Sequence, residues 1–112
     1  MNAHKFVAEH GIEEAKRVLN LAPQNSNYRY YSVDIGNSNS GWHVDYRANC
    51  IDLVELKQVV ESLDTIDRLF GLHHAKHTMG IAKEIGYSSD YEQIKQVIED
   101  YEHVQAYKNG DA

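Results

Sequence analysis

The hydrophobic positions between residues 52 and 63 recur with the period of an α-helix. Asp52, followed three residues later by Glu55, has the pattern of a helix N-cap with a capping-box acid. Because no other stretch has so broad an apolar stripe, we expect the rest of the chain to pack on this helix. The stripe consists of Leu53, Leu56, Val60 and Leu63, and Val54 and Val59 widen it.

Glycines and capping patterns divide the remaining apolar periodicity into further helices. Gly11 is expected to end a first short helix, and Asp64 is expected to begin a short helix that Gly71 ends. The last helix has Ser89 and Glu92 as a capping box. The predicted ranges are 3–10, 12–21, 64–70, 72–85 and about 90–107.

Two stretches, residues 28–35 and 42–47, alternate between apolar and polar side chains, as β-strands do. The residues between them are turn formers, so the pattern predicts a hairpin in which one face is apolar and rests on the central helix. The expected partners are Tyr30 with Arg47, Tyr31 with Tyr46, Ser32 with Asp45, Val33 with Val44, Asp34 with His43, and Ile35 with Trp42.

These elements predict an α+β fold. Two short N-terminal helices precede one antiparallel β-hairpin, and about four helices pack on it. The chain has 112 residues, of which 42% are hydrophobic and 25% charged, as is typical of one globular domain. We therefore expect a single domain over residues 1–107 and a frayed tail over 108–112. The single Cys50 leaves no intramolecular disulfide, and no apolar run is long enough for a membrane span, so we expect a cytoplasmic protein.

The net charge of −6 comes entirely from the second half of the chain. Acids and bases balance in residues 1–50, whereas residues 51–112 carry twelve acids and six bases. Such a surface does not suit phosphate, so we do not expect a nucleic-acid partner. The excess indicates either a solvated flank or a surface for a basic partner, with Glu99 and Asp100 of the last helix as candidate binding residues.

Eight tyrosines suggest a second candidate surface. In the predicted register Tyr28 and Tyr30 lie on the outer face of the hairpin, near His43 and Arg47. Tyrosine offers a large contact area at low entropic cost, which favours a binding patch. Ordinary strand propensity also accounts for tyrosines at these positions.

One helical face carries residues that can bind metals. His73 and His77 are four residues apart, and Glu84 falls on the same side. Two imidazoles and a carboxylate can hold zinc or nickel, although this spacing is also typical of a solvated polar face. The glutamate of a His-Glu-x-x-His motif is lacking. We expect no cofactor, and we keep a metal-dependent enzyme as an alternative.

No constellation of residues predicts catalysis. Cys50 is expected to be a small buried side chain, and Asp34 opposite His43 lacks a serine on a recognisable nucleophile elbow. The helix–glycine–helix at residues 7–19 would present Glu13 to DNA phosphates, which opposes binding. A nucleic-acid-linked regulator is nevertheless the first alternative, ahead of the metal-dependent enzyme.

Three segments of the chain belong together in one further pattern. They are Met1–Val7 with His10-Gly11, Leu21-Ala22-Pro23, and Asp-Leu-Val-Glu-Leu-Lys-Gln-Val-Val-Glu-Ser at residues 52–62. These segments resemble small accessory proteins of lambda-like phages and enterobacterial prophages, which have a similar opening, an Ala-Pro before a tyrosine-rich middle, and a Leu-x-Glu-Leu-Lys segment before a glycine-containing helical pair. The resemblance covers about residues 1–80, and residues 86–107 depart from it. It implies a bacterial cytoplasm and assigns no catalytic residue.

We therefore expect a non-enzymatic phage or prophage accessory protein that binds a host or phage protein. The apolar faces of the last two helices add a homodimer as a further hypothesis.

Overall fold

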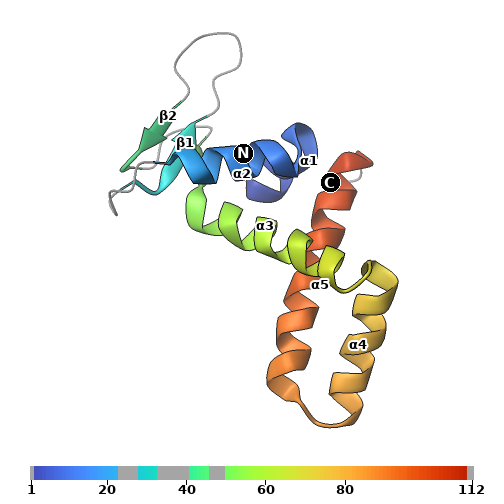
Figure 1. Ribbon diagram of the computed structural model, residues 1–112. Helices are drawn as coiled ribbons and strands as arrows, with labels where there is room; N and C mark the ends of the chain where they lie inside the picture. The colour runs from blue at the N-terminus through green and yellow to red at the C-terminus, as the bar shows by residue number, and fades with distance from the viewer. Residues whose placement is uncertain (1, 23–27, 33–40, 46–49, 111–112) are drawn as a thin grey trace. The chain divides into compact units, whose positions relative to one another are not determined.

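The computed structural model describes residues 2–22, 28–32, 41–45 and 50–110. The fold is α+β: two N-terminal helices precede an antiparallel sheet, and further helices follow it, as predicted (Figure 1). The elements are α1 (Ala3–His10), α2 (Ile12–Leu21), β1 (Tyr30–Ser32), β2 (Gly41–His43), β3 (Cys50–Asp52), α3 (Leu53–Arg68), α4 (Leu72–Glu84) and α5 (Ser88–Lys108).

The contacts within the chain group it into two compact units, Met1–Val60 and Glu61–Ala112. The dividing point lies inside α3, so this helix contributes its first half to unit 1 and its second half to unit 2. The single domain over residues 1–107 stays a prediction, as does the frayed tail. Helix α5 extends to Lys108, one residue beyond its predicted end.

The start of unit 1 follows the local signals in the sequence. The Asn2 side chain accepts a hydrogen bond from the Lys5 backbone N–H (2.8 Å), which caps α1. Gly11 has φ +90° and donates its N–H to the Val7 carbonyl (2.8 Å), which ends the helix where predicted. The buried residues of the two helices are Ala3, Phe6, Val7, Ala15 and Val18.

The sheet has three strands in the order β2-β1-β3, and its register differs from the predicted one. Tyr31 lies opposite Trp42 instead of Tyr46, and Tyr30 lies opposite His43 instead of Arg47. The shift is four residues, an even number, so Tyr31 and Trp42 still share a face. Alternation fixes which face a side chain occupies, but it cannot distinguish registers that differ by two or four residues.

The third strand, β3, was not predicted. Ile51 pairs with Tyr31, and both side chains are buried. Cys50 is also buried, as expected. Asp52 ends this strand and caps α3 as predicted, because its carboxylate accepts a hydrogen bond from the Val54 backbone N–H (2.9 Å). A strand of three residues is too short to show alternation.

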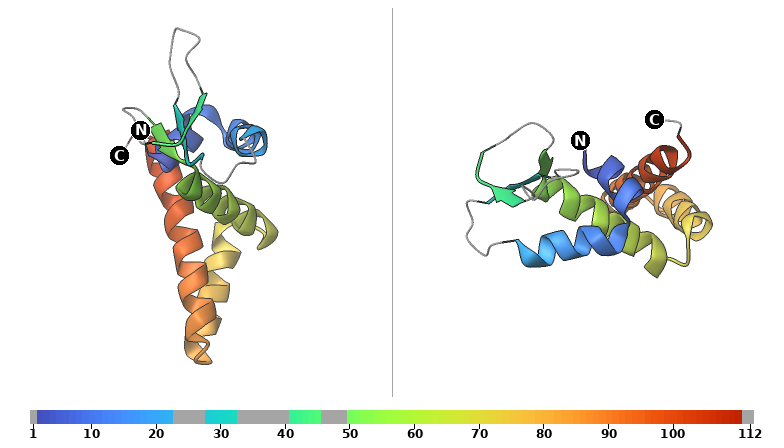
Figure 2. Two further views of the ribbon diagram at one scale, coloured as in Figure 1. Left: turned by 90° about the vertical axis from the view of Figure 1, so that its left-hand side faces the viewer. Right: turned by 90° about the horizontal axis from the view of Figure 1, so that it is seen from above.

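Helix α3 is continuous through Asp64, where the sequence predicted a new helix to begin. No helix-breaking residue precedes Asp64, and buried Ile66 continues the apolar stripe. In unit 1, α1 and α2 lie beside the first turns of α3, and the sheet lies at its N-terminal end (Figures 1 and 2).

Unit 2 contains a pair of antiparallel helices, α4 and α5 (Figure 1). The predicted capping box at Ser89 and Glu92 is wrong, because α5 begins at Ser88 and its N-cap residue, Tyr87, makes no side-chain capping bond. Across the described residues, no helix combines the length and apolar character needed to cross a membrane. The core of the unit is Ile66, Ala75 and Ile98, against which Leu69, Leu72, Met79, Ile94, Val97 and Tyr101 pack.

Candidate binding surfaces

Phe70 has an unusual backbone conformation and an unusually exposed side chain. Its φ is +63°, and it is the one non-glycine residue with positive φ in the described part of the chain. Its N–H donates to the Asp67 carbonyl (3.1 Å), and the Gly71 N–H donates to the Ile66 carbonyl (2.9 Å). These two bonds form a Schellman motif, in which the left-handed position is usually glycine. The Phe70 side chain is nevertheless 85% exposed.

The end of α4 shows the same motif with its usual residue. The Gly86 N–H donates to the Lys83 carbonyl (3.4 Å), and the Tyr87 N–H donates to the Ala82 carbonyl (2.9 Å). Gly86 takes the left-handed position with φ +81°. The Schellman motif at the end of α4 therefore has glycine in the left-handed position, whereas the motif at the end of α3 has an exposed phenylalanine there.

Two exposed histidines accompany Phe70. The rings of Phe70 and His74 meet edge to face with centroids 6.2 Å apart, and those of His73 and His74 do so at 6.1 Å. We call Phe70, His73 and His74 the aromatic corner. From the sequence, Phe70 was predicted only as the last residue of a helix. The sequence feature that could have indicated its exposure is an aromatic residue at the end of a helix, one position before Gly71.

A second exposed apolar surface lies where α4 turns into α5. Ile81, Ile85 and Tyr87 are 46%, 58% and 60% exposed there. They border an open cavity of about 270 Å³, which we call the tip groove. These residues were not predicted as a surface, although Ile81 and Ile85 are one helical turn apart on a face away from the predicted core stripe. The groove is lined by Thr78, Ile81, Ala82, Ile85, Tyr87, Asp90, Gln93 and Ile94.

The strand surface predicted from the tyrosines is only partly assembled. Tyr30 and His43 lie opposite each other, and Tyr28 is exposed. The His43 Nε2 lies 2.9 Å from the Ser32 hydroxyl oxygen, so this imidazole already has a hydrogen-bond partner. Arg47 lies outside the described residues. The register brings together two of the four predicted residues, and both are half-buried.

An ion pair ties the start of β1 to the end of β3. The Arg29 guanidinium donates to the Asp52 carboxylate (3.0 Å) and also lies 5.9 Å from the centroid of the Tyr30 ring. Burial alone would raise the pKa of Asp52. The hydrogen bonds from Arg29 and from the Val54 backbone outweigh that effect and hold the pKa below its usual value.

Asp52 is therefore expected to contribute stability that depends on pH. We expect Asp52→Ala to lower the free energy of unfolding by about 0.5–2 kcal/mol at neutral pH, because α3 loses its cap. The depressed pKa means that the contribution of the carboxylate is complete above the unfolded-state pKa of about 3.9. It is lost as the pH falls through the lower folded-state pKa. Urea unfolding of the wild type and of Asp52→Asn from neutral to acid pH measures this. If the wild type is no more acid-sensitive than the Asn variant, the carboxylate has no such role.

The predicted acidic surface on α5 is wrong at Asp100. This residue is 3% exposed, and its carboxylate accepts hydrogen bonds from the Ser62 hydroxyl (2.6 Å) and from the Gln96 amide (3.1 Å). Asp100 stands one turn before buried Val104, so it falls on the inner side of the helix. Glu99 is exposed, as expected.

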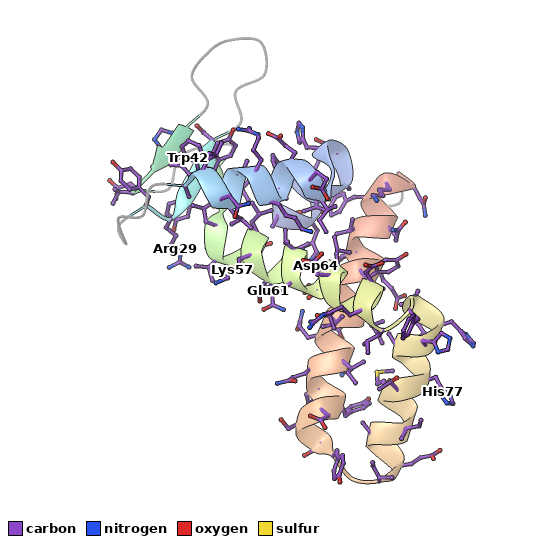
Figure 3. The ribbon with its side chains drawn as sticks, viewed as in Figure 1. Arg29, Trp42, Lys57, Glu61, Asp64 and His77 are labelled. Carbon is purple, nitrogen blue, oxygen red and sulfur yellow. The ribbon has the colours of Figure 1, made fainter. Side chains whose placement is uncertain are left out.

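The predicted metal ligands are not brought together. His73, His77 and Glu84 are all exposed, and Figure 3 shows His77 pointing away from α5. Glu84 follows His77 by seven residues, which is about 10 Å along a helix. Within the described ranges, no three His, Cys, Asp or Glu side chains form a group that could hold a metal ion.

Comparisons with protein-family models, with curated proteins and with solved structures found no significant match to this chain. Its function is therefore inferred from the surfaces described above.

Proposed function

We propose that this protein is a non-enzymatic binding protein, and that Phe70 is the anchor that enters an apolar pocket of its partner. The observation that carries the proposal is the combination of positive φ and 85% exposure at this residue. A left-handed conformation costs an L-residue about 1–2 kcal/mol. Strain of this kind is concentrated at functional sites.

The exposed ring adds a second unfavourable feature. An aromatic side chain in water gains no burial, and the one ring contact described for Phe70 is with exposed His74. Glycine would remove both the strain and the exposed apolar surface, as Gly86 does at the end of α4. Large aromatic residues are common among the few side chains that contribute most of the energy of a protein interface.

The expected partner is a host or phage protein. The resemblance of residues 1–80 to accessory proteins of lambda-like phages supports this choice and a bacterial cytoplasm as the setting. The exposed groups of the aromatic corner are suited to contact with another macromolecule, because a rigid ring gives a large contact area for little lost entropy.

The variant Phe70→Gly separates folding from binding. We expect it to raise the free energy of unfolding by up to about 1 kcal/mol, because glycine adopts positive φ without strain. We also expect it to lose the bound partner. Urea unfolding measures the first effect. Affinity capture from host lysate with quantitative mass spectrometry measures the second.

Val54→Ser is the matched control, because it removes an exposed apolar side chain from unit 1. It should retain the captured protein. The proposal is contradicted if Phe70→Gly captures the same protein in the same amount as the wild type.

A further inference from the structure

We propose that the tip groove is a second binding site, and that its occupant is an amphipathic segment with an aliphatic anchor beside a lysine or arginine. This site lies at the end of α4 opposite to Phe70, and its assignment does not depend on the aromatic corner. The occupant of the groove can belong to the protein that contacts Phe70 or to a different one.

The walls of the groove define the apolar half of the occupant. Ile81 and Ile85 provide one wall from α4, and Ile94 contributes from α5. The volume of about 270 Å³ is at the small end for ligand sites, and it suits one or two side chains better than a whole cofactor. Amphipathic helices bind such grooves by inserting anchors that are one turn apart.

The charge at the groove indicates which side chains the polar half of the bound segment carries. Asp90 is the one charged residue among those that line the groove, and no ion pair to its carboxylate occurs among the described residues. The neighbouring cation, Lys83, lines a separate cavity and lies 5.9 Å from the centroid of the Tyr91 ring. A carboxylate at the edge of an apolar groove is complementary to a cationic side chain next to an apolar anchor.

The excess of acidic residues in the second half of the chain supports the same choice of occupant. Near Asp90 in the sequence, exposed Glu84 and Glu92 are balanced by exposed Lys83 and Lys95, so the local preference for a cation comes from Asp90, the charged residue of the groove lining. The Gln93 amide can hydrogen-bond to the backbone of a bound segment, and the Thr78 hydroxyl, which donates to the His74 carbonyl (2.9 Å), can still accept a hydrogen bond.

A pair of designed helical peptides tests the inference with the full-length protein. Both present leucines on one face, with lysines on the other face in the first peptide and glutamates in the second. Fluorescence anisotropy of labelled peptides should show that the leucine–lysine peptide binds at least about tenfold more tightly. A third peptide, with serines in place of the leucines and the same lysines, should bind weakly, because charge alone does not fill the groove.

Two variants connect the preference to the groove. Ile85→Asp should weaken binding of the leucine–lysine peptide by more than about tenfold, because it puts a charge on the apolar wall. Asp90→Lys should reverse the preference between the two leucine peptides. Glu13→Lys makes the same charge change at an exposed position on α2, which does not line the groove, and it should leave the preference unchanged.

Several outcomes would overturn the inference. These are equal binding of the lysine and glutamate peptides, a preference that survives Asp90→Lys, or no binding of either peptide. A dimer in sedimentation that Ile85→Asp dissociates would assign the groove to a second copy of the chain. Capture of the partner by Phe70 would be unaffected in each case, so failure here is distinguishable from failure of the proposed function.

Discussion

Replacing Phe6 by alanine is expected to lower the free energy of unfolding by about 3–5 kcal/mol. Phe6 is 1% exposed, and its ring packs against those of His10 and Tyr31, with centroids 4.7 and 6.4 Å away. The truncation leaves a cavity where α1 meets the face of the sheet that carries Tyr31. Natural domains are stable by only about 5–15 kcal/mol, so the variant should be close to unfolding at ambient temperature.

Chemical denaturation followed by circular dichroism measures this loss. Phe6→Leu keeps most of the volume and should cost less than the alanine variant, which preserves a measurable transition if the alanine variant does not fold. Lys5→Ala alters an exposed neighbour and should change stability by no more than about 0.5 kcal/mol. A loss below about 1 kcal/mol for Phe6→Ala would show that this site does not belong to the core.

Removing the Ser62 hydroxyl is expected to destabilise the protein by about 1.5–3 kcal/mol. The hydroxyl donates to the carboxylate of Asp100 (2.6 Å), and both residues are buried. Ser62→Ala removes one hydrogen-bond donor from the Asp100 carboxylate, and because the site is buried, water does not take its place. The penalty for a buried charge that loses a partner exceeds the net value of an ordinary hydrogen bond.

A double-mutant cycle separates this bond from the other effects of each substitution. Ser62→Ala, Asp100→Asn and the double variant should show a coupling of about 1 kcal/mol or more, because residues in one buried network are not additive. Glu99→Gln changes an exposed carboxylate beside Asp100 and serves as the control. Additive losses in the cycle would mean that the bond contributes nothing to stability.

Local signals in the sequence were sufficient for most helix ends in this chain. Asn2 and Gly11 act at their own positions, so no distant contact is needed to read them. Gly71 was expected to end the preceding helix, but Phe70 takes the left-handed position after α3, one residue earlier. Asp64 shows the opposite case. A capping residue has no effect when the apolar stripe continues beyond it, and Ile66 continues the stripe.

The sheet and the binding surfaces depend on contacts that one sequence does not display. The face on which Tyr31 and Trp42 lie was predictable, but their pairing required knowledge of the turn between them. Asp100 was placed outside because charged residues are rarely buried, and its partner Ser62 is distant in sequence. The exposure of Phe70 and the tip groove arise from helix packing, which hydrophobic periodicity does not describe.

The chain has a single tryptophan, Trp42, and it lies in β2 of the first unit, with its ring centroid 5.2 Å from that of Tyr31. Indole fluorescence therefore follows melting of unit 1, whereas far-ultraviolet ellipticity sums over helices of both units. Two optical signals recorded on one sample can thus show whether the chain melts in a single step or in two.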